Sequence, residues 1–198
     1  MARPTENAKA YESYLKGRHL WSKRTTEAVR ASIECFRAAI EEDPNFALAY
    51  VGLADAYAIQ AAPLAEPALR KALELDDTIG EAHASMGFYR MFYHWDLPMA
   101  DHELRLAIEL SPNYATAHQW YAISLAVRGR FEEAKSAMAR AIECDPVSPN
   151  MRADMAQLCY FAGEHDAAVE HCRMALELDP TFLFAHQYLF AAHAGAAF

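Results

Sequence analysis

The sequence has 198 residues, 54% of them hydrophobic, and a formal net charge of −9 at pH 7. This charge argues against direct nucleic-acid binding, for which a basic domain or stripe is typical, while the apolar fraction is large enough for a folded core. Only 7 Gly are present and no Gly/Ser-rich or Pro-rich linker occurs, so the composition predicts one continuous, helical unit.

The four cysteines are too sparse for a secreted disulfide scaffold, and none forms a C-x-x-C pair. We expect four reduced thiols that act as small core residues. Residues 1–7 contain no apolar signal segment, and no uncharged apolar stretch reaches the ~18–20 residues of a membrane span. These features predict a cytoplasmic protein without a membrane span.

Five segments repeat one pattern, in which an Ala-rich stretch ends in an acidic residue or serine followed by proline or aspartate. The closing residues are Pro44, Asp77, Pro112, Pro146 and Pro180, so the successive spacings are 33, 35, 34 and 34 residues. Proline cannot donate the hydrogen bond that continues a helix, and its ring fits the first turn of the next helix. Each unit therefore predicts two helices that share a core with neighbouring pairs.

The fourth unit carries the pattern most completely, with small and large residues at helical spacing. These residues are His118, Tyr121, Ala122, Leu125, Gly129, Phe131, Ala134, Met138, Ala141 and Pro146. The pattern resembles the tetratricopeptide repeat (TPR) family. The resemblance implies an all-α fold, a right-handed superhelical solenoid of about five and a half helix-turn-helix pairs in a single array over residues 1–198.

In chain order, the expected pairs have regular lengths except in the first half of the array. The expected units are about 8–44, 45–78, 79–112, 113–146 and 147–180, with a half unit at 181–198. Relative to the family's 34-residue pattern, we expect about three extra residues in the first turn, around Ser22 to Thr26. The second unit lacks about one residue, near Ala62 and Pro63.

Histidine recurs at the position that the family reserves for tryptophan. The residues at this position are Tyr50, His83, His118, Arg152 and His186. We expect them to fill an aromatic packing site with the ring nitrogens bonded locally, and any role of His83, His118 and His186 beyond packing stays open.

A second resemblance concerns bacterial arrays joined to signalling domains. The stretches Glu81–Ser85 and Phe92–Asp96 are similar to those of TPR arrays that follow winged-helix, adenylate cyclase or Ser/Thr kinase domains. The resemblance implies that this chain is the sensory or docking part of a regulator, and that it carries none of the other domain's activity.

Motifs that carry chemistry are missing from the sequence. The nine histidines and four cysteines have no zinc spacing, and no H-E-x-x-H, G-x-S-x-G, P-loop or G-x-G-x-x-G motif occurs. We therefore expect no catalytic residue, no metal, no cofactor and no enzymatic activity.

The resemblance to TPR proteins implies that the first helix of each pair lines a groove that binds a partner. The expected groove residues are Asp55, Phe88, Phe92, Gln119, Trp120, Asp154, Gln157, Tyr160, Gln187 and Tyr188. Met91, Ile123 and Phe161 also fall at the family's inward positions. Aromatic side chains are frequent anchors in interfaces. The alternative is that several of these side chains pack against the neighbouring repeat, and both interpretations stay open here.

The chemistry of the expected groove favours one kind of partner. Some TPR proteins hold a terminal carboxylate with Lys, Arg and Asn, but of the matching positions only Arg18 is suitable. We expect instead a protein or peptide of unknown identity with apolar and amide side chains, bound in an extended or helical form.

The last expected helix, 181–198, has no charged residue apart from its histidines. Arrays usually end in a helix with a polar outer face. We therefore expect either that the chain continues into a longer protein or, as an alternative function, that this uncapped helix mediates homo-oligomerisation.

Overall fold

The computed structural model describes residues 5–60 and 63–195, with side chains as far as His193. Within these ranges the chain forms eleven α-helices and one short π-helix, η1, and no strand. The all-α prediction is confirmed. None of the described helices has both the length and the apolar character that a membrane span requires.

The helices follow one another with short connections. They are α1 (Ala8–Ser22), α2 (Thr26–Glu42), α3 (Ala47–Ile59), α4 (Ala65–Leu75), α5 (Gly80–Tyr89), η1 (Arg90–His94), α6 (Leu97–Leu110), α7 (Ala115–Val127), α8 (Phe131–Cys144), α9 (Pro149–Phe161), α10 (His165–Leu178) and α11 (Leu183–Gly195).

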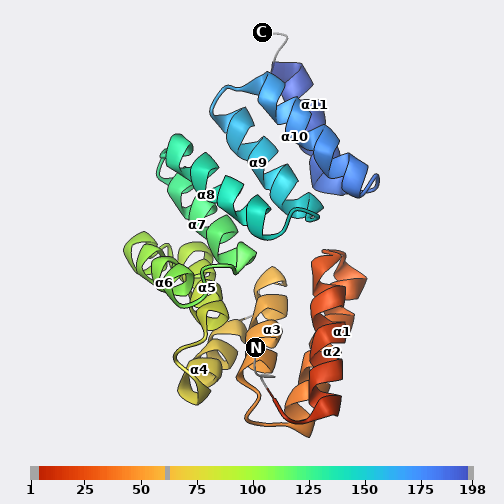
Figure 1. Cartoon of the computed structure of the whole chain (residues 1–198), viewed down its shortest axis with the longest axis vertical. Coiled ribbons are helices and arrows are strands. Elements are labelled where there is room, and N and C mark those ends of the chain that lie inside the picture. Colours follow the sequence, from red (N-terminus) through yellow and green to blue (C-terminus); the bar gives the residue numbers. More distant parts are fainter. Residues whose placement is uncertain (1–4, 61–62, 196–198) are drawn as a thin grey trace. The chain divides into compact units, whose positions relative to one another are not determined.

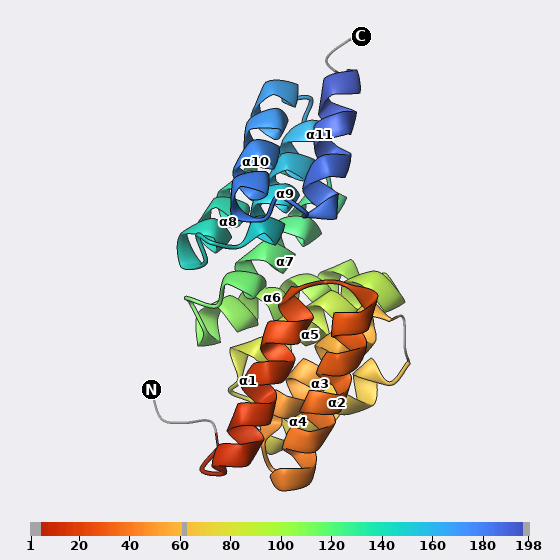
Figure 2. The ribbon, with the colours of Figure 1, turned by 90° about the vertical axis from the view of Figure 1, so that its right-hand side faces the viewer.

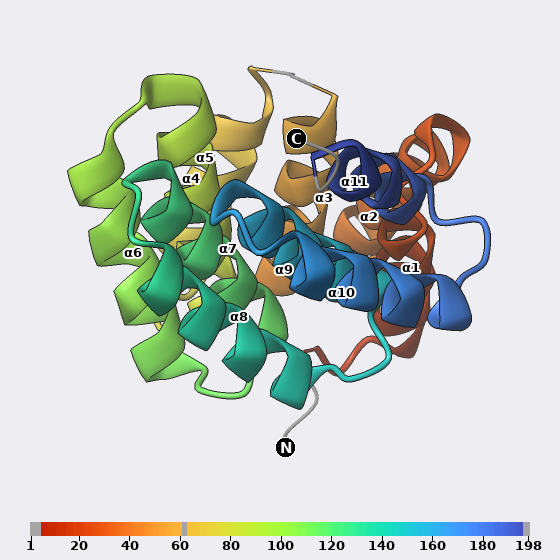
Figure 3. The same cartoon turned by 90° about the horizontal axis from the view of Figure 1, so that it is seen from above.

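The chain separates into two compact units, with the boundary between Pro112 and Asn113. Unit 1 contains the antiparallel pairs α1/α2, α3/α4 and α5/α6, and the first helices α1, α3 and α5 contact one another in order. Unit 2 contains α7/α8 and α9/α10, and α11 packs against both α9 and α10 (Figures 1, 2 and 3). The boundary falls where the sequence predicts the third pair to end, whereas a single array over the whole chain stays a prediction.

In three of the pairs, the aspartate before the closing residue caps the turn that follows it. The carboxylates of Asp43, Asp76 and Asp179 each accept the backbone N–H two residues later, at 3.0, 2.9 and 2.9 Å. This Asx turn supplies a hydrogen bond that the ended helix no longer provides. The repeated acid in the sequence therefore has a local structural role.

The side chain at the family's tryptophan position, which lies on the next helix, forms a hydrogen bond to the same turn in three of the units. Tyr50 Oη donates to the carbonyl of Pro44 at 3.2 Å, and His186 Nε2 donates to that of Pro180 at 2.9 Å. His83 Nε2 donates to the carbonyl of Asp77 at 2.8 Å. In each case the acceptor lies six residues earlier, at the residue that closes the preceding pair. At these positions the side chain does form the local bond that the sequence predicts.

The extra residues of the first pair lie in its two helices and not in its turn. α1 and α2 are joined by residues 23–25, the same length as the connections 128–130 and 162–164 of the later pairs. α2 instead has 17 residues, against 14 in α8 and in α10, and α1 has 15 residues, against 13 in α7 and in α9. The prediction of a longer turn around Ser22 to Thr26 is therefore wrong, because helical periodicity alone does not locate an insertion within a pair.

The shortened second pair has its missing length in α4, which has only 11 residues. Ala62, where the sequence places the deletion, lies outside the described residues. The third pair has the opposite change: its 35-residue spacing accompanies η1, a five-residue π-helix at the end of α5. A π-helix accommodates one extra residue in a helix and is frequently found at functional sites.

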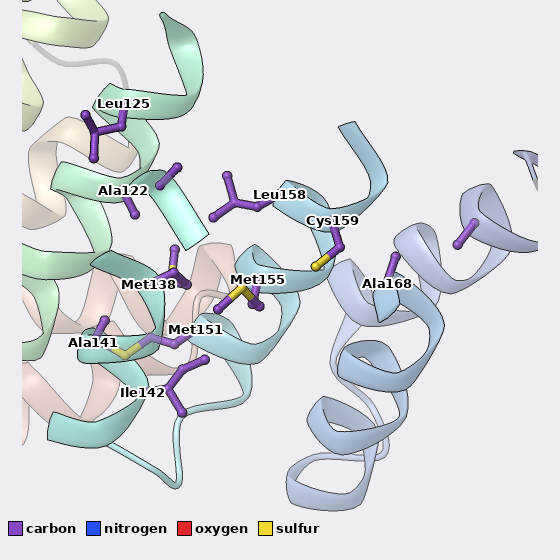
Figure 4. Close-up of a cluster of buried hydrophobic side chains, with 12 residues drawn as sticks. Ala122, Leu125, Met138, Ala141, Ile142, Met151, Met155, Leu158, Cys159 and Ala168 are labelled. Carbon is purple, nitrogen blue, oxygen red and sulfur yellow. The ribbon is translucent and has the colours of Figure 1, made fainter. Parts of the chain in front are cut away.

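The core of unit 2 joins side chains from all its helix pairs. Figure 4 shows Leu125 from α7, Met138 from α8 and Met155 and Leu158 from α9 converging in one buried cluster. Alanines at 122, 134, 141 and 168 are fully buried in it. Their small size lets the helices approach, while the large side chains fill the space between them.

Candidate partner-binding site

In unit 1, a buried ionic network ties the three first helices together. Arg18 Nη1 of α1 donates to Asp55 Oδ2 of α3 at 3.1 Å, and Ser85 Oγ of α5 donates to Asp55 Oδ1 at 2.5 Å. The Asp55 side chain is only 1% exposed. Burial raises the pKa of the Asp55 carboxyl above its ordinary value, although Arg18 and Ser85 act in the opposite direction.

Because of this network, the predicted polar residue of unit 1 is paired inside the protein, and only the aromatic residues are left for a partner. Asp55 binds side chains of the neighbouring helices α1 and α5. Its ion pair with Arg18 occupies the one cation that would suit a carboxylate clamp. Phe88 and Phe92 remain as the aromatic part of the face, with ring centroids 4.5 Å apart. Phe88 is half-buried and Phe92 is exposed.

In unit 2, polar side chains also join adjacent first helices. Gln119 Nε2 of α7 donates to Asp154 Oδ2 of α9 at 2.6 Å, and Gln157 Nε2 of α9 donates to the Tyr188 hydroxyl of α11. The structure therefore brings four of the predicted residues together in two pairs. Burial raises the pKa of Tyr188 above its ordinary value, so its hydroxyl is neutral at physiological pH.

The remaining predicted residues of unit 2 differ in exposure. Trp120 is only 5% exposed and is a core residue, and Tyr160 is half-buried against the core and close to the His165 ring, with centroids 5.5 Å apart. Gln187 is exposed. For Trp120 and Tyr160 the burial favours packing against neighbours, and their assignment to a partner site remains a prediction.

Two exposed aromatic residues complete this face: Phe161, which is among the family's inward positions, and Phe184, which is not. Phe161 is 58% exposed and Phe184 is 47% exposed. Each lies four residues from a member of the Gln157–Tyr188 pair, and residues at this spacing share a helix face. Counting helical spacing from Tyr188 would have found Phe184 as well. We call these four residues of α9 and α11 the first-helix face of unit 2.

The potential metal ligands and two of the cysteines have well-defined surroundings in the described part of the chain. No three potential ligands of the His, Cys, Asp and Glu types come together there. Burial raises the pKa of Cys172 to about 11 and also raises that of Cys159, so both thiols are protonated at neutral pH. A protonated, buried thiol is a packing residue and not an activated nucleophile.

His83 has a second interaction that goes beyond packing. Its Nδ1 lies 2.7 Å from Glu103 Oε2 of α6, while its Nε2 faces the carbonyl of Asp77. The hydrogen bond to Glu103, assisted by the one to Asp77, raises the pKa of His83 above its ordinary value. A carbonyl and a carboxylate both accept hydrogen bonds, so this environment favours the imidazolium form, which links α5, α6 and the preceding turn.

Comparison with known proteins shows what part of the chain and its fold are similar to. The family model for the tetratricopeptide repeat matches residues 122–181. A search of curated proteins found no match. The structure is similar to a thermophilic TPR protein of Thermus thermophilus, with a TM-score of 0.76 and 19% identity over 93% of this chain and 99% of that one.

Two further solved structures are similar. YrrB, described as a TPR protein with an unusual peptide-binding site, has a TM-score of 0.55 and 21% identity over 93% of this chain and 98% of that one. The human IFIT1 dimer with m7Gppp-AAAA has a TM-score of 0.80 and 17% identity over 95% of this chain and 47% of that one. At these identities the likeness concerns the fold. Residues 122–181 therefore match the tetratricopeptide repeat, and the chain has the fold of TPR proteins over most of its length.

Proposed function

We propose that the chain is a protein-interaction scaffold that binds a peptide or a partner domain on its first helices. The observation that carries the proposal is the first-helix face of unit 2, where Phe161 and Phe184 are exposed one turn from the hydrogen-bonded Gln157 and Tyr188. Exposed aromatics supply apolar anchors, and an ordered polar pair orients the ligand. Unit 1 contributes a smaller face, with Phe92 exposed beside Phe88.

The side chains of the first-helix face favour one chemical kind of partner. Of the side chains on the first-helix face, none is a lysine or arginine, and the polar groups are an amide, a hydroxyl and the nearby carboxylate of Asp154. A ligand with apolar side chains and amide groups can bury against the two phenylalanines and exchange hydrogen bonds with Gln157 and Tyr188. We therefore propose an uncharged, extended or helical peptide segment.

A peptide selection tests this function. Phage-displayed dodecapeptides are selected on the immobilised chain, and the enriched sequences are synthesised and measured by fluorescence polarisation. Phe161→Ala and Phe184→Ala are each expected to weaken binding by about 2 kcal/mol, or roughly thirty-fold, because each removes an aromatic anchor. Val147→Ala serves as the matched control, since Val147 is also exposed but lies in a turn. Equal affinity for both phenylalanine variants and the wild type would contradict the proposal.

Self-assembly through α11 is the second candidate function. α11 contains no Asp, Glu, Lys or Arg, and Phe190 on it is 79% exposed. The corresponding residues of α3, α7 and α9, at Ala54, Ala122 and Ala156, are small and buried. Phe190 is too large for the close helix approach that an alanine permits, so we propose that it inserts into another copy of the chain.

Analytical ultracentrifugation over a range of concentrations tests this second candidate. The wild type is expected to show a concentration-dependent dimer that Phe190→Asp abolishes and Val147→Asp does not. A monomer at every concentration would remove self-assembly from consideration and leave the scaffold proposal untouched.

The cellular setting forms a further part of the proposal. We infer that the chain is the sensory or docking part of a bacterial, cytoplasmic signalling regulator. It acts through protein contacts, without catalysis and without direct contact to nucleic acid. The support is the resemblance of residues 81–85 and 92–96 to arrays joined to signalling domains, together with the net charge of −9. Sequencing the reading frame around this segment would test it, because a regulator should encode an adjoining signalling domain.

A further inference from the structure

The turn between the two helices of a pair uses a left-handed backbone conformation. Gly129 and Gly163 occupy this turn position in the fourth and fifth pairs, with φ of 73° and 82°. In the first and third pairs the same position holds Arg24 and Trp95, with φ of 56° and 54°. Only glycine adopts this conformation without a steric penalty, so an arginine and a tryptophan here require an explanation.

For Arg24 the explanation lies inside the molecule. Its guanidinium carbon lies 3.7 Å from the centroid of the Trp21 ring, a stacked cation–π contact with the last turn of α1. The interaction between a cation and an aromatic face therefore offsets the unfavourable backbone of the first turn.

For Trp95 no such compensation is visible within the described residues. Its side chain is 75% exposed, and the backbone N–H groups of Trp95 and Asp96 close η1 by bonding to the carbonyl of Arg90. The bonds that hold the turn are backbone bonds, which glycine would make equally well. A strained backbone that carries an exposed, unpacked side chain is typical of a functional position.

The π-helix places further aromatic surface beside Trp95. Four consecutive residues, Phe92 to Trp95, are exposed, and Met99 in the first turn of α6 is also exposed. Tyr93 is anchored by its hydroxyl, which donates to the carbonyl of Ala58 at the end of α3. Contiguous exposed apolar residues on a soluble protein are typical of an interaction site. We call Tyr93, Trp95 and Met99 the turn patch.

The charges around the turn patch select the partner. Asp96 adjoins Trp95, and its carboxylate caps α6 by accepting the Met99 N–H at 3.2 Å, with no cationic partner among the described residues. The nearby His94 faces Glu66 at 3.8 Å, and Glu66 is also paired with Arg70. An exposed indole face beside an unpaired carboxylate in a chain of net charge −9 is complementary to a cation.

We propose that the turn patch is a second docking surface, separate from the first-helix face, and that it binds an arginine or lysine of a partner polypeptide whose flanking residues are apolar. The cation stacks on the Trp95 indole as Arg24 stacks on Trp21, and Asp96 pairs with its charge. Tyr93 and Met99 contact the apolar neighbours. The large residue in the strained turn is thereby used for binding and not for folding.

The first test separates a binding role from a structural one. In Trp95→Gly the side chain is removed and the backbone strain is relieved, so urea unfolding should show stability equal to or above that of the wild type. A marked loss of stability in Trp95→Gly would show that the side chain holds the turn together and would overturn the proposal. Val147→Gly is the control for losing an exposed apolar side chain in a turn.

The second test measures binding with defined probes. Among the dodecapeptides selected on the wild-type chain, one class should contain arginine or lysine between apolar residues and bind Trp95→Gly about ten-fold more weakly. Replacing the basic residue of such a peptide by glutamine should have a similar effect. If selection yields no such peptides, or if they bind Trp95→Gly as tightly as the wild type, the proposal is wrong. Peptides weakened by Phe161→Ala alone report on the first-helix face, so the two proposals can fail independently.

A spectroscopic readout locates the contact directly. Trp21 and Trp120 are each 5% exposed, so iodide quenching of the tryptophan fluorescence reports mainly on Trp95. Adding the arginine-containing peptide should protect the fluorescence from iodide, and the glutamine version should not. Quenching that is unchanged by saturating arginine peptide would place the peptide elsewhere and refute the turn patch.

Discussion

Replacing Gly87 with alanine is expected to destabilise unit 1 by about 2 kcal/mol, even though alanine is the better helix former. A Cβ at this position of α5 would lie 2.6 Å from Leu104 Cγ and 3.1 Å from the carbonyl oxygen of Ala100, both in α6. Leu104 is fully buried and has no solvent-facing space to move into. Overpacking of this kind costs up to about 3 kcal/mol, of which the gain in helix propensity offsets about 1 kcal/mol.

A double-mutant cycle with Leu104→Ala makes this prediction specific. Urea unfolding followed by circular dichroism gives the free energy of unfolding of the wild type, both single variants and the double variant. Leu104→Ala alone should cost about 3 kcal/mol because it opens a cavity. In the double variant the new methyl group enters vacated space, so the combined loss should fall short of the sum by about 1 kcal/mol or more. An additive cycle, or a Gly87→Ala variant as stable as the wild type, would refute the argument that close helix approach selects glycine here.

Two further predictions concern charged groups. Because the folded pKa of His83 is raised, its stabilisation is fully present below the unfolded pKa of about 6.5 and is lost as pH rises through the folded pKa. Urea unfolding at several pH values should show this loss in the wild type and not in His83→Gln, and identical pH profiles would contradict it. Arg18→Met should cost about 3 kcal/mol at neutral pH, where it leaves Asp55 buried without its cation. The cost should shrink in acid, where Asp55 is protonated, and a pH-independent cost would argue against the network.

Much of the fold is encoded in short stretches of sequence. The spacing of Pro44, Asp77, Pro112, Pro146 and Pro180 predicts where each pair ends, because proline and Asx turns act on backbone groups within a few residues. The same local logic predicts that the side chain at the family's tryptophan position bonds nearby. Sequence spacing also reveals that the first three pairs are irregular, but it does not say whether an extra residue lengthens a helix, a turn or a π-helix.

The candidate site was only partly predictable. Helical spacing places Gln157 and Tyr188 on first helices, but their hydrogen bond depends on the register between α9 and α11, which many distant core contacts set together. The same holds for Asp55: its sequence position marks it as a groove residue, and tertiary packing makes it the buried centre of a network.

The sequence by itself thus predicted the all-α fold, the residues that close the helix pairs and the resemblance to TPR proteins, since these follow from periodicity and from backbone chemistry within a turn or two. Tertiary structure decided which polar residues of the first helices form hydrogen bonds or ion pairs with one another, and which aromatic residues stay exposed. It also put Trp95 in a left-handed turn, because the extra residue of the third pair is taken up as a π-helix whose end reaches the position held elsewhere by glycine. Burial and register are properties of helices packed together, and no single stretch of the chain contains them.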